Sequence, residues 1–334
     1  MLNADLLDGA VRLIGQSENI LITTHIKPDG DACGSVTAMT RVLQQQGKNV
    51  KILMLSEVPR WYEFLFDEKP AVFEKDVTSE QLSNGDFIQA DMVVLVDVNS
   101  ENQLEGFSDY LKLNSKKVLV LDHHVTNDGL GAVELIDTSA AAAGLIVFDL
   151  IKYANWPIDE KIAEALFMAI ATDTGWFRFT NTDSRTHRVC AELLDKGVDS
   201  ASLYHRLYRN FSSERFALMN LMLSRLQLHF DGRYACQEIL GNDLVRTGAT
   251  IVDTENLIDE CQRIGTVEVA ALFTELNDGR IKCSLRSKGD VDVRKIAQKF
   301  GGGGHTMAAG TYVTGTIQEA QEKIKAQIQK QLCL

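Results

Sequence analysis

The sequence predicts an α/β protein whose N-terminal part is a doubly wound, mainly parallel sheet. Short apolar runs at 20–24, 50–55, 92–96 and 118–121 alternate with helical patterns, as βαβ units do. The runs at 92–96 and 118–121 are continuously apolar, which predicts strands covered by helices on both faces. The length of 334 residues exceeds the usual size of one domain and therefore favours two.

The second half of the chain predicts a smaller α/β domain. We expect a first domain over 1–198, a helical linker over 199–229 and this smaller domain over 230–334. A broad apolar surface indicates one long helix over 214–228 within the linker. The expected elements of the smaller domain are strands at 234–239, 267–274 and 280–285 and helices at 293–300 and 318–332.

Composition limits the partners and the compartment. The net charge of −12 provides no basic field for long duplex DNA, so any phosphate ligand must be short and held locally. Six cysteines without a C-x-x-C pair indicate a reduced protein. The start of the chain lacks a signal-peptide pattern, and the longest uncharged apolar run, 140–148, is too short to span a bilayer. We therefore expect a cytoplasmic protein that binds no membrane.

Acidic and imidazole side chains follow three of the expected strands and one expected helix. In chain order they are His25, Asp29 and Asp31, then Asp97, then Asp122, His123 and His124, and finally Asp173. The carboxyl ends of parallel strands share one edge of a sheet, so these groups should meet there. Crowded carboxylates repel one another unless cations lie between them. The pattern therefore predicts a cluster of hard divalent metal ions, although an ordinary turn at Asp29–Asp31 would also suit Pro28 and Gly30.

Two further stretches contain groups that suit a phosphate ligand. Arg178 follows the Asp173 segment, and a guanidinium matches phosphate geometry. In the second half, Arg286 and Ser287 precede the run Gly301–Gly304 and His305. Four glycines usually form a flexible linker, but the neighbouring helix and strand patterns favour a backbone cradle for an anion, with Arg286 and His305 as its side-chain partners.

The residues between 25 and 175 resemble the four ordered motifs of the DHH phosphoesterase superfamily. The motifs are His25-x-x-Pro-Asp-Gly-Asp31-Ala, the lone Asp97, Asp122-His-His124 and Thr172-Asp-Thr-Gly175. The resemblance implies two divalent cations per chain, most often Mn²⁺, while Mg²⁺ or Co²⁺ would suit the same ligand types. It implies that His25 and Asp29 hold one cation, that Asp31, His123 and Asp173 hold the other, and that Asp97 bridges them. It also implies that Asp122 orients a ligand histidine and that His124 faces the substrate phosphate. The catalytic residues would thus be Asp97, Asp122 and His124.

The pattern from Arg286 to Gly310 resembles the first type of DHH-associated domain, and the whole chain resembles the NrnA-like group of the superfamily. This implies hydrolysis of very short single-stranded RNA or dinucleotides to mononucleotides, and removal of the 3′-phosphate from 3′-phosphoadenosine 5′-phosphate (pAp). It also implies a possible homodimer. The implied substrate-binding residues are Arg178, Arg286, Ser287, Gly301, Gly302, Gly303, Gly304 and His305.

Three other functions stay open. The first is hydrolysis of cyclic di-AMP or its linear product, by a stand-alone enzyme with the same motifs and length. The second, a RecJ-like exonuclease acting on single-stranded DNA, is disfavoured because the chain has no room for a further DNA-binding domain. The third is a noncatalytic nucleotide-binding protein, which is disfavoured because every candidate ligand is present.

Overall fold

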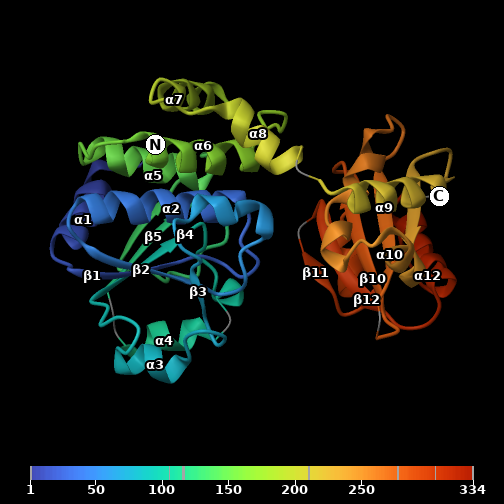
Figure 1. The fold of residues 1–334 in the computed structure, drawn as a ribbon, viewed down its shortest axis with the longest axis horizontal. Helices are drawn as coiled ribbons and strands as arrows, with labels where there is room; N and C mark the ends of the chain where they lie inside the picture. Colours follow the sequence, from blue (N-terminus) through green and yellow to red (C-terminus); the bar gives the residue numbers. More distant parts are fainter. Residues whose placement is uncertain are drawn as a thin grey trace. The chain divides into compact units, whose positions relative to one another are not determined.

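Two compact units make up the chain, Met1–Arg209 and Asn210–Leu334 (Figure 1). The computed structural model describes residues 2–104, 106–114, 117–209, 211–276, 278–304 and 306–332. The segment 199–229, which we expected to link the domains, contains α8 (Ser200–Tyr208) in the first unit. It also contains α9 (Ser213–Ser224), which lies in the second unit. Its role as a linker stays a prediction.

The first unit contains a six-stranded, entirely parallel sheet with the order β3-β2-β1-β4-β5-β6. This arrangement confirms the doubly wound parallel fold. The strands are β1 (Asn19–Thr23), β2 (Asn49–Met54), β3 (Ala71–Val72), β4 (Met92–Val96), β5 (Lys117–Asp122) and β6 (Val133–Ile136). The other elements are α1 (Ala4–Gly15), α2 (Gly30–Gln45), η1 (Arg60–Leu65), α3 (Ser79–Asn84), η2 (Glu101–Gln103), α4 (Phe107–Asn114), α5 (Ala143–Tyr153), α6 (Glu160–Asp173), α7 (Ser184–Leu194) and α8.

Helices cover both faces of this sheet, as the continuously apolar strands predicted (Figure 1). Ile20 and Ile22 of β1 point into a core shared with α1, α2, α5 and α6. Leu21, between them, points into the opposite core, which includes Phe107 of α4 and Leu82 of α3. Successive side chains of a strand face opposite sides of a sheet, so an all-apolar strand requires a cover on each.

Glycines allow α2 to approach α6 closely. A Cβ atom on Gly34 would lie 2.5 Å from the carbonyl oxygen of Ala165, and one on Gly30 would lie 2.4 Å from the Thr172 hydroxyl. Any larger residue would therefore separate the two helices. Since Asp31 begins α2 and Asp173 ends α6, this contact brings the two carboxylates to the same place.

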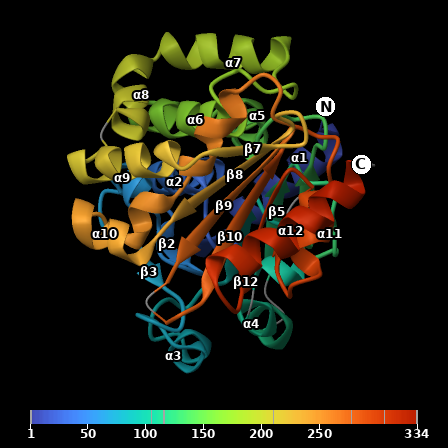
Figure 2. The same cartoon turned by 90° about the vertical axis from the view of Figure 1, so that its right-hand side faces the viewer.

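The second unit is built on a mixed sheet with the order β11-β12-β10-β9-β8-β7, in which only β8 and β9 are parallel (Figure 2). The strands are β7 (Gln227–His229), β8 (Tyr234–Ile239), β9 (Val269–Glu275), β10 (Ile281–Ser287), β11 (Gly303–Gly304) and β12 (Ala308–Val313). The other elements are α9, α10 (Gly241–Thr247), η3 (Ile251–Thr254), η4 (Leu257–Arg263), α11 (Val293–Gln298) and α12 (Ile317–Gln331). One face packs on α11 and α12, and the other packs on α9 and η4. The smaller α/β domain is confirmed.

The expected long helix over 214–228 is wrong at its C-terminal end. Helix α9 ends at Ser224, and Leu228 lies in the short strand β7. The physical reason is tertiary: Arg225, the residue that follows α9, pairs with Asp243 at the start of α10, and the chain then adds β7 to the edge of the sheet. Apolar spacing alone did not distinguish the helix from the strand that follows it.

Burial of the thiols agrees with a reduced protein. Among the described residues, Cys33, Cys190, Cys236, Cys261 and Cys283 are free and buried. None of the described helices combines the length and apolarity that a bilayer crossing requires.

Candidate metal centre

The candidate ligands lie where the strand order of the first sheet reverses. Strand β1 has β2 on one side and β4 on the other, so neighbouring connections leave the sheet in opposite directions at this point. Such a reversal opens a crevice at the carboxyl ends of the strands, where α/β proteins bind ligands. His25 follows β1, Asp97 follows β4, and His123 follows β5. The structure therefore brings together side chains that the sequence predicted to meet.

Three overlapping groups of side chains have ligand atoms within 4.8 Å of one another. They are His25–Asp29–Asp97, Asp31–His123–Asp173, and Asp97–His123–His124. The first two groups together contain all six metal ligands that the family resemblance implies. Asp97 also belongs to the third group, which connects it to both histidines that follow β5.

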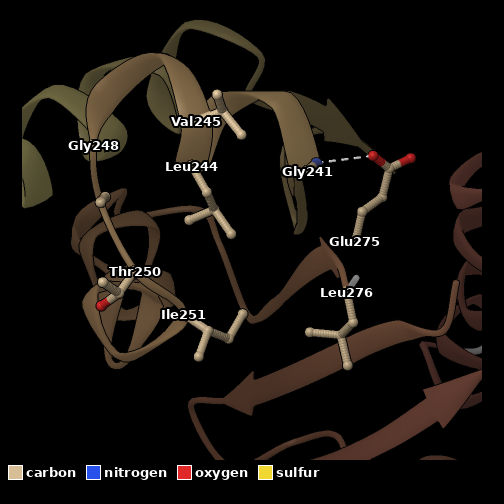
Figure 3. A pocket seen from close by; sticks show the side chains of 9 residues that line it. Gly241, Leu244, Val245, Gly248, Thr250, Ile251, Glu275 and Leu276 are labelled. Atoms are coloured by element: carbon tan, nitrogen blue, oxygen red, sulfur yellow. Dashed lines mark hydrogen bonds between the residues drawn. The ribbon is translucent and has the colours of Figure 1, made fainter. Parts of the chain in front are cut away.

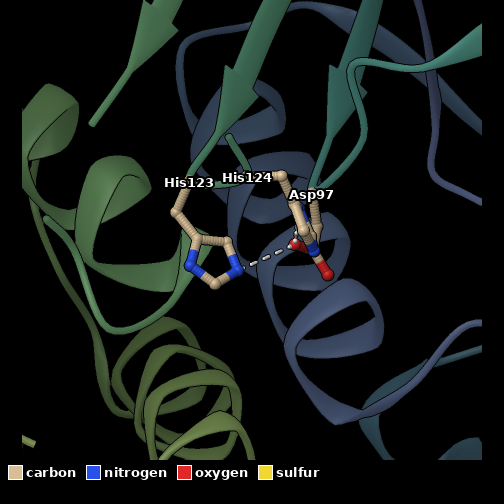
Figure 4. Close-up of side chains that lie close together, drawn as sticks. All are labelled: Asp97, His123 and His124. Atoms are coloured by element: carbon tan, nitrogen blue, oxygen red, sulfur yellow. Dashed lines mark ion pairs between the residues drawn. The ribbon is translucent and has the colours of Figure 1, made fainter. Parts of the chain in front are cut away.

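The distances within these groups fit ligands around shared cations. Nε2 of His123 lies 3.5 Å from Oδ1 of Asp97 (Figure 4). The same atom lies 3.7 Å from Oδ2 of Asp173 and 3.8 Å from Oδ2 of Asp31. Nε2 of His25 lies 3.5 Å from Oδ2 of Asp97. Two atoms that each lie about 2.1 Å from one ion are about 3–4 Å apart. Oδ1 of Asp97 is buried and makes no hydrogen bond to any described residue, so it is available as a ligand.

Backbone carbonyls fix the orientation of two candidate ligand histidines, His25 and His123. Nδ1 of His25 lies 2.8 Å from the carbonyl oxygen of Ile26, and Nδ1 of His123 lies 3.2 Å from that of Ala140. A carbonyl oxygen only accepts, so each Nδ1 carries the proton and donates it. This tautomer leaves Nε2 without a proton once the ring is neutral, which is the form that ligates a metal.

Local backbone geometry positions the carboxylates. Asp29 is the N-cap of α2, and its Oδ1 accepts from the N–H groups of Asp31 and Ala32 at 3.0 and 3.1 Å. Asp97 adopts a left-handed backbone conformation (φ 59°), which is uncommon for a residue other than glycine and often marks a functional position. The sharp turn after β4 places its carboxylate between His25 and His123.

Asp31 has a second contact that the sequence did not indicate. Its side chain is 1% exposed and accepts hydrogen bonds from the N–H groups of Ala143 and Gly144 at the start of α5, and from the Ser35 hydroxyl. Ser35 lies four residues after Asp31 on the same helix, a spacing from which that contact could have been predicted. The contact with α5 depends on helix packing and has no local signal.

The side chains of the cluster shift one another's pKa values strongly. Burial alone would lower the pKa of His123, but Asp97 and Asp31 raise it to about 10. Burial likewise opposes protonation of His25, yet Asp97 and Asp29 raise its pKa to about 9. Burial raises the pKa of Asp173 to about 7, with Asp97 adding to the effect. Positive charge is therefore strongly favoured between these carboxylates, and a bound dication would supply it.

The chain is similar over nearly its full length to characterised phosphoesterases. The model of the DHH family N-terminal domain matches residues 19–170, and that of the DHHA1 domain matches residues 232–330. A bifunctional oligoribonuclease and PAP phosphatase NrnA of Thermus thermophilus is 33% identical over 316 residues, which is 94% of this chain and 90% of that protein. The chain belongs to the DHH/DHHA1 phosphoesterase family.

Two further relatives extend the comparison. A bifunctional oligoribonuclease and PAP phosphatase NrnA of Bacillus subtilis is 26% identical over 310 residues, covering 91% of this chain and 92% of that protein. The crystal structure of an exopolyphosphatase-related protein from Bacteroides fragilis superposes with a TM-score of 0.92 at 24% identity. It covers 99% of this chain and 97% of the other, and it shows that the two proteins share a fold.

In this DHH domain, Asp122 contacts a different histidine from the one we expected. Its Oδ1 lies 2.8 Å from Nδ1 of His124, while the candidate ligand His123 contacts the carbonyl oxygen of Ala140 instead. Asp122 is completely buried, and the hydrogen bond raises the pKa of His124. The contact of Asp122 is thus with the histidine that we expected to face substrate, and its role toward a metal-ligand histidine stays a prediction.

The substrate-binding residues expected in the DHHA1 domain have partners within that domain. Nε of Arg286 lies 3.0 Å from Oδ1 of Asp259, and its Nη1 donates to the carbonyl oxygen of Leu285. The hydroxyl of buried Ser287 accepts from the N–H of Gly289. In the DHH domain, exposed Arg178 donates from Nε to the carbonyl oxygen of Gly175. Substrate binding by these residues stays a prediction.

The glycine run of the DHHA1 domain is an ordered turn between α11 and the sheet. We expected the backbone N–H groups of this run to bind an anion. Those of Gly301 and Gly302 instead donate to carbonyl oxygens at the end of α11, so they are not free to do so. Gly303 and Gly304 form β11, which pairs with β12. A Cβ on Gly302 would lie 2.2 Å from the carbonyl oxygen of Gly310, so this close approach requires glycine. His305 lies outside the described residues.

A cavity of about 480 Å³ in the DHHA1 domain contains none of the predicted site residues. It lies between α10, η3 and the end of β9, with Leu244, Val245, Ile251 and Leu276 among its lining side chains (Figure 3). The carboxylate of Glu275 at its edge accepts from the N–H of Gly241. Its lining is mainly apolar, in contrast to the metal cluster.

Proposed function

We propose that the chain hydrolyses very short oligoribonucleotides to mononucleotides and removes the 3′-phosphate from pAp. The observation that carries the proposal is the pair of ligand groups His25–Asp29–Asp97 and Asp31–His123–Asp173, connected by the 3.5 Å approach of His123 to Asp97. The oligoribonuclease and PAP phosphatase activities of the Thermus and Bacillus relatives support the choice of substrates. The net charge of −12 agrees with a short substrate, since long strands require a basic track.

The donor set fits two hard divalent cations such as Mn²⁺. In this proposal His25 and Asp29 hold one cation, Asp31, His123 and Asp173 hold the other, and Asp97 bridges them. Mixed carboxylate and imidazole ligands suit Mn²⁺ and also accept Mg²⁺ or Co²⁺. Bound there, the cations would polarise the phosphate oxygens and make water a better nucleophile.

The chain's own contribution to bond cleavage is assigned to His124. Asp122 accepts from its Nδ1, which leaves Nε2 free to donate a proton. Asp122 also raises the pKa of His124, so the imidazolium persists to higher pH than in water. A protonated imidazole beside the phosphate stabilises the charge that develops on the leaving alkoxide. The proton thus passes from Nε2 of His124 to the leaving oxygen.

The test is product analysis with the full chain. Metal-depleted protein is supplied with Mn²⁺ and offered labelled oligoribonucleotides of two to five residues, pAp, cyclic di-AMP and single-stranded DNA. We expect mononucleotides from the short RNAs and AMP from pAp. Dominant turnover of cyclic di-AMP, or of long DNA, would replace the proposal with the corresponding alternative.

Variants of the metal ligands connect this activity to the cluster. Asp97→Ala and His123→Ala should each abolish hydrolysis of both substrates and leave the fold intact. His205→Ala provides the matched control, because this imidazole lies on α8 and belongs to none of the three ligand groups. Near-normal turnover in either ligand variant would show that the cluster is not the catalytic centre.

A further inference from the structure

The turn that follows α6 has an unusual backbone. Gly175, Trp176 and Phe177 are consecutive residues in the left-handed conformation, with φ values of 54°, 56° and 65°. Glycine adopts this conformation readily, but aromatic residues rarely do, and such residues are concentrated at functional sites. The rings of Trp176 and Phe177 pack against Phe167 of α6, with centroids 6.1 and 6.0 Å from that ring. Packing on α6 therefore holds the turn in this conformation.

The turn leads the chain back to Asp173, one of the candidate metal ligands. The N–H of Phe179 donates to the carbonyl oxygen of Thr174 at 3.1 Å. Nδ2 of Asn181 donates to the carbonyl oxygen of Asp173 at 3.2 Å. Gly175 lies only two residues after Asp173, so their Cα atoms are at most about 7 Å apart. Phe179 thus lies in a turn that starts and returns beside the candidate metal centre.

Gly175 provides the space into which the ring of Phe179 extends. A Cβ atom on Gly175 would lie 2.5, 2.6 and 2.7 Å from Cζ, Cε1 and Cε2 of this ring. The tip of the ring therefore rests directly on the backbone of the turn, where any larger residue would displace it. The contact places the ring two residues from the Asp173 carboxylate.

Phe179 differs from the other two aromatic residues of the turn because it is exposed. It is 55% exposed, whereas Trp176 and Phe177 are half-buried and pack against the core of the DHH domain. Among the described residues, no other aromatic ring and no cationic side chain packs on the Phe179 ring. Exposed aromatic faces stack on nucleobases, whatever the base. The ring is therefore available as a stacking surface beside the candidate metal centre.

The neighbouring Arg178 provides a charge that suits the same ligand. Its Nε donates to the carbonyl oxygen of Gly175 at 2.7 Å. Within the described part of the chain, its Nη atoms make no hydrogen bond and no ion pair. A guanidinium with N–H groups to spare suits a phosphate, even in a protein of net charge −12. An exposed ring and an unpaired guanidinium are complementary to the base and the phosphate of a nucleotide.

We propose that the exposed ring of Phe179 stacks on the base of the nucleotide whose phosphate lies at the metal cluster. Arg178 contacts a phosphate of the same substrate. Because a phenyl ring stacks on every base, the contact selects nucleotides over other phosphate esters without a preference for sequence. The inference rests on the proposed function, since it takes a nucleotide as the substrate, and it assigns the residue that recognises the base.

The binding test compares AMP with ribose 5-phosphate, which carries the same phosphate and no base. Calorimetry with the full chain and Mn²⁺ should show tighter binding of AMP. Phe179→Leu should weaken AMP binding by about five-fold or more and leave ribose 5-phosphate binding unchanged. Phe179→Tyr keeps the ring and should bind AMP as the original protein does. Phe216→Leu is the matched control, because Phe216 is 62% exposed on α9 of the other domain, and it should leave both affinities unchanged.

Kinetics and thermal unfolding separate stacking from a structural role. With pAp as the substrate, Phe179→Leu should raise KM by a similar factor with little change in kcat. Its Tm should stay near that of the original protein, because the side chain is exposed. A lower Tm with unchanged AMP binding would overturn the inference.

The same measurements distinguish this inference from the proposed function. Turnover of pAp with equal KM values in the original protein and Phe179→Leu would overturn the stacking contact and leave the proposed function intact. AMP binding that depends on the Phe179 ring, without turnover of pAp or short RNA, would support the stacking contact and contradict the proposed function alone.

Discussion

The carboxylate of Asp31 in α2 accepts a 2.6 Å hydrogen bond from the backbone N–H of Ala143, at the start of α5. The same side chain belongs to one of the candidate ligand groups. Helix α5 has no capping side chain of its own, so Asp31 takes that place from a neighbouring helix. One carboxylate therefore serves both the fold and the site.

Because of this double role, alanine substitutions of Asp31 and Asp173 should have different effects on the stability of metal-depleted protein. Burial raises the pKa of Asp31 as well, but Asp31→Ala also leaves two buried N–H groups unpaired and should therefore lower the free energy of unfolding, by about 1–3 kcal/mol. Asp173→Ala should instead be neutral or stabilising at pH 7.5. Folding raises the pKa of this carboxyl to about 7, so its charge opposes folding above the ordinary pKa. Urea unfolding in EDTA measures both, and equal destabilisation would contradict the capping role.

Metal binding should release protons. In metal-free protein the pKa values of His123 and His25 are raised to about 10 and about 9, so both rings are protonated at pH 7.5. A metal requires neutral imidazole, so binding should release up to about two protons per chain. The apparent affinity should therefore rise with pH and level off above the higher pKa. Calorimetry of Mn²⁺ binding in two buffers of different ionisation enthalpy gives the number of protons released. Identical heats in the two buffers would contradict this prediction.

Replacing Asp122 should change proton donation and leave metal binding intact. Asp122→Asn weakens the contact with His124 and removes the charge that raises its pKa. The kcat for a short RNA should fall by about ten-fold or more, with little change in KM. The alkaline limb of the kcat profile should move to lower pH, because His124 then loses its proton earlier. Bound Mn²⁺, measured by mass spectrometry, should stay at the original level, and its loss would mean that Asp122 supports the ligands instead.

Arg286 and Asp259 should have opposite effects on substrate capture. Arg286→Ala should raise KM for short RNA with little change in kcat, as expected of a residue that only binds substrate. Asp259→Ala releases the guanidinium from its 3.0 Å ion pair and should lower KM or leave it unchanged. Steady-state kinetics of both variants provides the comparison. A similar rise of KM in both would indicate that the pair acts structurally.

The glycine run offers a matched pair of substitutions. Gly302→Ala places a methyl group 2.2 Å from a backbone oxygen of Gly310, which cannot move without breaking β12, and should destabilise the DHHA1 domain by about 2 kcal/mol or more. Gly303→Ala meets no atom within 4 Å and should change stability by less than about 0.5 kcal/mol. Urea unfolding followed by circular dichroism distinguishes the two. Equal tolerance would mean that the close turn is not required.

Local patterns were enough to predict the C-terminal ends of β1, β4 and β5 to within one residue. In each case an apolar run leads within two residues to histidine or aspartate, so the strand and the position of the candidate ligand are both visible in the sequence. The edge strand β6 was missed because Val-Glu-Leu-Ile is only partly buried and carries a charge. Strand β12 was missed because its sequence, Ala-Ala-Gly-Thr-Tyr-Val, contains a glycine and only one β-branched apolar residue, so the strand pattern is weak.

Long-range contacts explain what the sequence could not predict about the site. Asp122 contacts His124 and not the adjacent His123. His123 has a distant partner instead, because its Nδ1 contacts the carbonyl oxygen of Ala140. The steric need for Gly302 depends on a carbonyl eight residues further on, across two paired strands. Contacts of this kind are fixed by packing, which residue types and spacing do not reveal.

The parallel arrangement of the first sheet has a consequence for how the protein matures. His25 and Asp173 come close together only after β4 has paired with both β1 and β5 and after α6 has packed on α2. Contacts so distant in sequence form late and slowly. A nascent or half-folded chain therefore lacks a complete ligand set, and acquisition of Mn²⁺ would mark the completion of folding.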